Sequence, residues 1–300
     1  MNREEANTIV MSEILKKLGY EPVKDSGNET FFISPINDNK AASFVVDKLN
    51  NAWYDLTEGA SGDVVEFVRS YLKYSGEDNT DADIYRWLMN MSAPQTPSAP
   101  DMFSSINDNT AMPALCFERI SELRYPALVK YLESKGISIA VAKKYLNEIL
   151  VRNLHTGKKF YAFGLSTESE GFELRNRVFR GSIGTQSISF VRGTKVPADE
   201  IHIFEDMMDF MSAVMHNGED FQGDVLILNS VFCLPMSTAY IRNYSYRKIN
   251  TWLNNDTAGV MATRNLKDTA EILKIGFTPM NKMYAPFKSV NAWHLQKDLL

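Results

Sequence analysis

Acidic and amide side chains follow two apolar runs late in the chain. Glu205 follows "IHIF", with Asp209 one helical turn later, and Asn254 and Asp256 follow "INTWL". Strand-like and helix-like runs alternate here, which predicts a mostly parallel sheet with functional residues at its carboxyl ends. Mg²⁺ prefers such oxygen ligands, often one or two carboxylates with substrate phosphate. The pattern indicates a divalent-cation site; the alternative is that Glu205 and Asp256 cap helix N-termini.

Basic residues gather earlier, in and around "FELRNRVFRGS". Arg175 and Arg177 lie two apart in a predicted strand and should share a face, with Arg180 just beyond. Lys158 and Lys159 are close in sequence. Guanidinium groups suit phosphate, so these five residues are candidates for binding nucleic acid. A solvated strand face is the alternative.

Composition limits the class of protein. The chain has 300 residues, 44% of them hydrophobic, and a net charge of -5, so a nucleic-acid site must be a local patch. Two cysteines without a CxxC pattern argue against a disulfide framework and suit a reducing compartment. The polar start "MNREEANTIV" is no signal peptide, and no apolar run reaches the roughly 18 residues that span a bilayer. We therefore expect a cytoplasmic protein without a membrane partner.

One shift in composition divides the chain. Residues 92–113 are rich in Pro, Ser, Asn and Asp and lack apolar periodicity, which is typical of a linker. The predicted domains are a small α+β unit (1–91), the linker (92–113), a basic α+β segment (114–198) and an α/β domain (199–300).

The late segments "IHIFEDMMDFMSAV", "DVLILNSV" and "INTWLNNDTAGVMATRNL" resemble the Toprim domain of bacterial-type primases and topoisomerases. Glu205 and Asp209 fall on the two acidic residues of its first motif, and Asp256 falls on the second aspartate of its Asp-x-Asp motif. The resemblance implies a Toprim-type, mostly parallel sheet flanked by helices. It also implies that Glu205, Asp209 and Asp256 are catalytic and that Glu205, Asn254 and Asp256 hold Mg²⁺ or Mn²⁺.

Several positions depart from that family. Asp206 stands where glycine is usual, and Asn254 stands where the first aspartate of the later motif is expected. In "FKSVNAW", which resembles a Lys-Asp-x-Asn-Asp segment of primase-like Toprim proteins, Ser289 and Ala292 replace the acidic residues. Each replacement of a carboxylate removes a charge that would attract a cation. We therefore expect a weakened metal site.

The N-terminal unit resembles the primase zinc-ribbon domain through "FFISPINDNKAASFVV" and "NAWYDLTEGASGDVVEFV". Ser34, Asn37, Asp55 and Glu58 stand at the zinc-ligand positions, and these residue types do not suit structural zinc, so we expect none. Residues 113–192 resemble the part that precedes Toprim in primase-like proteins of mobile elements.

Together, these resemblances imply a phage-like or mobile-element DNA primase-like protein of DNA replication. It would carry out metal-dependent nucleotidyl transfer on a single-stranded DNA template, with nucleotides as substrates and a replicative helicase as a candidate partner. One alternative is a catalytically weakened Toprim protein that binds DNA or a replication partner. A Toprim nuclease is a third possibility, which the ribbon-like unit disfavours.

Overall fold

The computed structural model describes residues 1–92 and 115–297. The predicted linker, 92–113, falls outside them except for Ser92, the last residue of a helix. The described chain forms two compact units: residues 1–92 with Arg242–Tyr244, and residues 115–241 with 245–297. No helix in the described ranges is both long enough and apolar enough to cross a bilayer.

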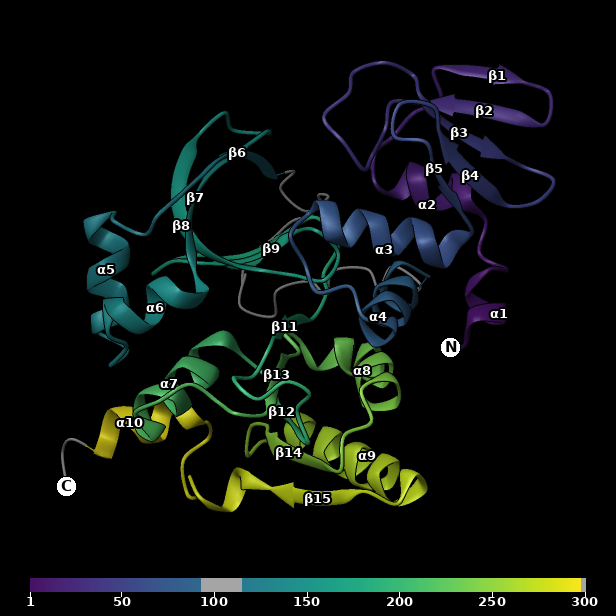
Figure 1. Cartoon of the computed structure of the whole chain (residues 1–300). Coiled ribbons are helices and arrows are strands. Elements are labelled where there is room, and N and C mark those ends of the chain that lie inside the picture. Colours follow the sequence, from purple (N-terminus) through teal and green to yellow (C-terminus); the bar gives the residue numbers. More distant parts are fainter. Residues whose placement is uncertain (93–114, 298–300) are drawn as a thin grey trace. The chain divides into compact units, whose positions relative to one another are not determined.

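The first unit contains a five-stranded antiparallel sheet in sequence order (Figure 1). Its strands are β1 (Lys24–Ser26), β2 (Glu29–Phe32), β3 (Phe44–Asp47), β4 (Ala52–Asp55) and β5 (Ala60–Gly62), and its helices are α1 (Arg3–Ala6), α2 (Met11–Lys17), α3 (Val64–Tyr74) and α4 (Asp81–Ser92). Phe44 stacks on Trp53 with centroids 5.2 Å apart, and Phe67 meets both rings. This aromatic cluster forms the centre of the unit's core.

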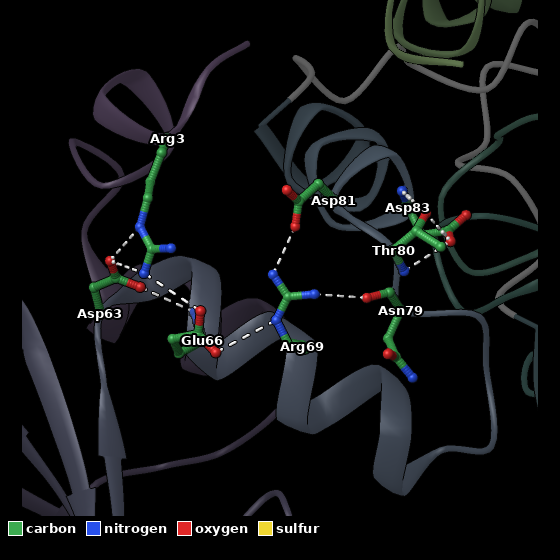
Figure 2. Close-up of polar contacts among 8 residues, drawn as sticks. All are labelled: Arg3, Asp63, Glu66, Arg69, Asn79, Thr80, Asp81 and Asp83. Atoms are coloured by element: carbon green, nitrogen blue, oxygen red, sulfur yellow. Dashed lines mark hydrogen bonds and ion pairs between the residues drawn. The ribbon is translucent and has the colours of Figure 1, made fainter. Parts of the chain in front are cut away.

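Polar side chains join the helices of this unit (Figure 2). Asp63 caps α3 by accepting a hydrogen bond from the Glu66 N–H, at 3.0 Å. The Arg3 guanidinium of α1 lies 2.8 Å from Asp63, and Arg69 of α3 lies 2.7 Å from Asp81 at the start of α4. Because these groups are partly exposed, each ion pair contributes little, and the aromatic core supplies most of the stability.

The second unit begins with an antiparallel sheet of order β10-β9-β8-β7-β6. Its elements are β6 (Leu115–Ser121), α5 (Pro126–Glu133), α6 (Ile139–Tyr145), β7 (Asn147–Asn153), β8 (Lys159–Ser166), β9 (Phe172–Arg175) and β10 (Arg180–Ile183). A bulge at Glu118 interrupts the pairing of β6 with β7. Strands β9 and β10 form a hairpin in which Arg175 is directly opposite Arg180.

A mixed sheet of order β11-β13-β12-β14-β15 follows. Strand β11 pairs antiparallel with β13, and the other pairings are parallel. Its elements are β11 (Ser189–Val191), β12 (Glu200–Phe204), α7 (Met207–Asn217), β13 (Asp224–Ile227), η1 (Val231–Met236), α8 (Ser237–Asn243), β14 (Lys248–Trp252), α9 (Thr257–Leu273), β15 (Gly276–Pro279), η2 (Met280–Lys282) and α10 (Val290–Lys297). Figure 1 shows α7 and α10 on one face and α8 and α9 on the other. The protein thus has a mixed α/β fold with antiparallel and mixed sheets.

One hydrophobic cluster joins both sheets of the second unit. It includes Phe163 and Leu165 of β8 and Phe204 at the end of β12. Phe204 is opposite Trp252 in the pairing of β12 with β14, and the two rings stack at 5.3 Å. The stacked rings fix the carboxyl ends of the two strands side by side.

Candidate functional site

The strand order reverses between β12 and β14, and we call the region just beyond the carboxyl ends of these two strands the crevice. From β12 the chain moves to β13 on one side, and from β14 it moves to β15 on the other. In open α/β sheets, ligands bind where the strand order reverses in this way. Glu205 directly follows β12 and Asn254 lies just beyond β14, and the Asn254 N–H donates to Glu205 Oε2 at 3.2 Å. The structure therefore brings these two predicted site residues together.

The turn after β14 has a fixed shape. Asp256 Oδ1 accepts a hydrogen bond from the Gly259 N–H at 3.0 Å and caps α9. A Cβ on residue 259 would lie 2.2 Å from the Asn254 carbonyl oxygen, so glycine is required there. The Tyr284 hydroxyl donates to the Leu253 carbonyl at 2.6 Å. These contacts set the backbone that carries Asn254 and Asp256.

The capping alternative is correct for one carboxylate and wrong for the other. Asp256 caps α9. Helix α7 is capped by Asp206, which accepts from the Met208 N–H at 2.7 Å, and Glu205 therefore remains available to the crevice. Asp206, which stands where the Toprim resemblance leads one to expect glycine, therefore has the capping role.

The two carboxyl groups at the crevice, Glu205 and Asp256, have pKa values shifted in opposite directions. Burial raises the pKa of Glu205, and the nearby carboxylates of Asp256 and Asp206 raise it further, against the hydrogen bond from Asn254. Burial also opposes ionisation of Asp256, but its hydrogen bonds and the Lys288 ammonium, whose Nζ is 3.0 Å from Oδ2, outweigh this and lower its pKa. One carboxylate thus already has a cationic neighbour, while the other holds its proton more tightly than usual.

Asn254 has a buried side-chain oxygen, Oδ1, with no hydrogen-bond partner among the described residues. An unsatisfied buried acceptor is costly, so this oxygen fits a cation or a donor that the described residues do not supply. No group of three or more His, Cys, Asp or Glu side chains in residues 1–92 and 115–297 is placed to hold a metal. Two carboxylates with one amide oxygen can still suit Mg²⁺, which relies on substrate phosphate and water for its other ligands.

Asp209 lies deeper in the structure. It is 3% exposed, and its Oδ1 accepts a hydrogen bond from the Asn291 N–H at 2.8 Å. Burial, followed by the charge of Asp206, raises its pKa to about 7. The Asn291 side chain also donates to Ser212 Oγ at 2.8 Å, so this contact holds residues 288–292 against α7. Asp209 therefore positions the segment that carries Lys288.

Lys288 was missed as a site residue. Its carbonyl accepts from the Asn255 N–H at 2.7 Å, and its ammonium pairs with Asp256. The similarity of "FKSVNAW" to a lysine-containing family segment was the signal that could have identified it.

Two of the predicted nucleic-acid-binding arginines are engaged by Asp206. Arg175 Nη1 lies 2.8 Å and Arg180 Nη2 lies 3.3 Å from Asp206 Oδ2. Arg180 also donates to the Asn229 carbonyl at 3.0 Å. The two like charges face each other across the hairpin, and the carboxylate between them balances their repulsion.

The prediction that Arg175 and Arg177 share a strand face is wrong. Strand β9 ends at Arg175, and Asn176 Oδ1 accepts from the Val178 and Phe179 N–H groups at 2.9 and 2.8 Å, which forms a turn. Arg177 lies in this turn, exposed.

The two predicted lysines differ in their surroundings. Lys159 forms an ion pair with Glu118, whose Oε1 lies 2.6 Å from Arg152 Nε in a second ion pair. Lys158 is exposed and has no ion-pair partner among the described residues. Of the five predicted basic residues, Arg177 and Lys158 are therefore the ones whose charge is most open to an outside phosphate.

The four positions predicted to have lost zinc ligands converge in the first unit. Asp55, 1% exposed, accepts from Ser34 Oγ at 2.6 Å and from Asn37 Nδ2 at 3.1 Å. Its other oxygen accepts from the Thr57 N–H and hydroxyl at 2.9 and 2.6 Å and from the Glu58 N–H at 3.4 Å. Burial opposes ionisation, but these bonds outweigh it and lower the pKa of Asp55 to about 2. An ionised carboxylate thus ties the two loops together.

Comparisons with known proteins find one partial family match and a distant sequence similarity to a primase. A family described as a domain of unknown function (DUF8464) matches residues 117–184, which span most of the antiparallel sheet of the second unit. A DNA primase of Legionella pneumophila is 27% identical over 129 residues, which is 42% of this chain and 22% of that protein. The chain therefore matches less than a quarter of the length of this curated relative.

Two solved structures show a distant likeness. The zinc-binding and RNA polymerase domains of the Aquifex aeolicus primase give a TM-score of 0.42 at 12% identity, covering 98% of this chain and 81% of that chain. The primase fragment of the bacteriophage T7 primase-helicase protein gives 0.44 at 13% identity, covering 87% and 93%. At these scores the likeness carries no conclusion about activity.

Proposed function

We propose that this chain is a DNA primase-related protein of DNA replication, of phage or mobile-element type, that binds single-stranded DNA and nucleotide phosphates. Residues 199–300 would be its Toprim-type domain. The observation that carries this proposal is the direct contact between Glu205 and the Asn254 backbone in the crevice where the strand order reverses. Sequence similarity to a DNA primase supports the same assignment.

In this proposal Glu205, Asn254 and Asp256 would hold Mg²⁺ or Mn²⁺ weakly, and a bound cation would supply positive charge to offset that on phosphoryl oxygens in nucleotidyl transfer. The buried, unpartnered Oδ1 of Asn254 supports a ligand role for that residue. Burial raises the pKa of Glu205, so this carboxyl would hold its proton more readily than an ordinary glutamate and could serve as a general acid or base. Asp209 and Lys288 position the crevice, and a replicative helicase is a candidate partner.

We also propose that the first unit is a zinc-ribbon derivative that needs no zinc. Its support is the Asp55 carboxylate, which gathers Ser34, Asn37 and the Glu58 backbone around one point. Hydrogen bonds to a buried charge can join two loops much as a shared metal would.

The test is a priming assay on single-stranded DNA with ribonucleotides and Mn²⁺. Asn254→Asp should raise both primer yield and Mn²⁺ affinity about tenfold, because it restores a full negative charge opposite the cation. Glu205→Gln should abolish synthesis. Asn265→Asp is the matched control, since it makes the same change at an exposed position of α9 and should alter neither quantity.

A second candidate function is a DNA-binding module without catalysis. It is favoured by internal charge balance, because Lys288 already pairs with Asp256 and Asp206 already pairs with Arg175 and Arg180. If neither the wild type nor Asn254→Asp synthesises primers, while both bind single-stranded DNA, this function replaces the first. If no single-stranded DNA is bound at all, both are wrong.

A further inference from the structure

Two tyrosines from different elements stack at the surface of the second unit. Tyr125 immediately precedes α5 and Tyr161 lies in β8, with ring centroids 4.5 Å apart and an interplanar angle of 25°. Tyr125 is 42% exposed. An exposed aromatic face of this kind is suited to stacking with a nucleobase, and stacking tolerates any base because every base has a π-face.

Buried and partly buried groups hold the pair in place. Glu148 is 7% exposed, and its Oε2 accepts from the Arg124 and Tyr125 N–H groups at 3.0 and 2.6 Å. On the other side, Asn176 Nδ2 donates to the Tyr161 carbonyl at 2.9 Å. A buried carboxylate that fixes the backbone of an exposed aromatic residue makes the surface rigid before any ligand arrives, which lowers the entropic cost of binding.

Arg119 contacts this aromatic pair, and Arg177 belongs to a turn that is bonded to Tyr161. Arg119 and Tyr161 share a face of the sheet because both are opposite Leu150, and Arg119 Nη2 donates to the Tyr161 hydroxyl at 3.3 Å. Arg177 follows Asn176 in the turn tied to Tyr161. Both arginines are exposed, and neither has an ion-pair partner in the described parts of the chain. They remain available to phosphate.

Charge distribution favours a polyanion as the occupant. Residues 117–184 contain 12 lysines and arginines against 7 acidic residues, whereas the whole chain contains 32 against 37. An acidic peptide would also be attracted, but a flat stacked ring with guanidinium groups on neighbouring elements suits exposed bases. Duplex DNA hides its base faces, so the fit is to a single strand.

We propose that Tyr125, Tyr161, Arg119 and Arg177 form a stacking site for single-stranded nucleic acid, with a base on the ring of Tyr125 and phosphates at the two arginines. This site rests on the proposed function for its partner, but it lies on the antiparallel sheet rather than in the crevice of Glu205. It assigns a role to the matched domain of unknown function.

The test compares a fluorescein-labelled oligothymidylate with an abasic oligonucleotide of the same length, which keeps the phosphates and lacks the bases. Tyr125→Leu and Tyr161→Leu should each weaken binding of oligothymidylate about tenfold and leave the abasic probe unaffected. Tyr161→Phe should retain most of the affinity. Arg119→Gln should weaken both probes and lower the slope of log K against log salt by about one.

Phe117→Leu is the matched control. Phe117 is also 42% exposed, but it is opposite Val151 and so lies on the other face of the same sheet. Its replacement should change the binding affinity for neither probe. Circular dichroism verifies that each variant is folded. Unchanged oligothymidylate affinity in Tyr125→Leu, or equal losses for both probes, would overturn the stacking site and leave the crevice function standing. Failure of the wild type to bind either probe would overturn both the stacking site and the proposed function of the crevice.

Discussion

Glu173 is a buried carboxyl that holds its proton near neutral pH. It is 5% exposed, and burial raises its pKa to about 8, even though Arg180 Nε lies 3.7 Å from Oε1. Because the native pKa lies above the ordinary value, the unfolded chain releases this proton first as pH rises. The group therefore lowers the free energy of unfolding progressively between about pH 4.5 and pH 8.

Glu173→Gln should remove that loss. We expect the variant to gain stability over the wild type as pH rises, by on the order of 3 kcal/mol between pH 5 and pH 8. Urea unfolding at several pH values measures the difference. Glu133→Gln, at an exposed carboxylate of α5, is the control and should run parallel to the wild type. A Glu173→Gln curve that also runs parallel would contradict the prediction.

Residue spacing predicted which strand ends come together, but not what every side chain there contacts. Glu205 and Asn254 meet because hydrophobic runs marked β12 and β14 and parallel strands end at the same edge. The capping role of Asp206 and the pairing of Lys288 were not predictable. Both depend on the exact path of the chain after a strand, and the pattern of apolar residues does not encode that path.

At the scale of the element, the β9–β10 hairpin depends on a carboxylate from another strand end. Asp206→Asn keeps an acceptor that can cap α7 but leaves Arg175 and Arg180 facing each other uncompensated. We expect a loss of about 3 kcal/mol in the free energy of unfolding. Adding Arg180→Leu to Asp206→Asn should recover part of it, because the like-charge pair is gone. Denaturant unfolding of the single and double variants checks this, and an additive double variant would contradict it.

The first unit offers a second element-scale prediction. Asp55→Asn replaces a buried, ionised acceptor with an amide that cannot accept every bond from Ser34, Asn37 and Thr57. Because the native pKa is depressed to about 2, the wild type should lose this stabilisation only as pH falls from about 4 to about 2. The variant should be destabilised by about 2 kcal/mol at pH 7.

A companion experiment tests whether the first unit depends on zinc by adding a zinc chelator to the wild-type protein. The midpoint of wild-type thermal unfolding should not change, because the loops are joined by hydrogen bonds to Asp55. A large fall on chelation would mean that a metal holds the unit and would defeat the proposal of a zinc-independent ribbon.

Helices and strands were more predictable than their joins. Met11, Ile14 and Leu15 recur at helical spacing in the sequence, and they form the buried side of α2. The turn at Asn176 was missed, because "FELRNRVF" keeps a strand-like composition through the point where the Asn176 side chain takes over backbone hydrogen bonds. Such local competition is decided by geometry and not by composition.

At the scale of the whole molecule, charge is divided unequally along the chain. Residues 117–184 have a surplus of basic residues, while the full chain has a net charge of -5. A nucleic acid should therefore be attracted to this region and repelled by the rest of the chain. Only a few phosphate contacts should form, so added salt should weaken binding with a shallow slope of log K against log salt. The exposed charges of Arg177 and Lys158 should account for much of that dependence.

Replacing Arg177 and Lys158 together with alanine should lower the salt slope for a single-stranded oligonucleotide by about two, one for each lost phosphate contact. Arg264→Ala removes an exposed arginine from α9, outside the basic region, and should leave the slope unchanged. Fluorescence anisotropy across a range of salt concentrations gives both values. If Arg264→Ala lowers the slope by as much per removed charge as the double replacement of Arg177 and Lys158, binding follows net charge alone. The basic region would then have no special role.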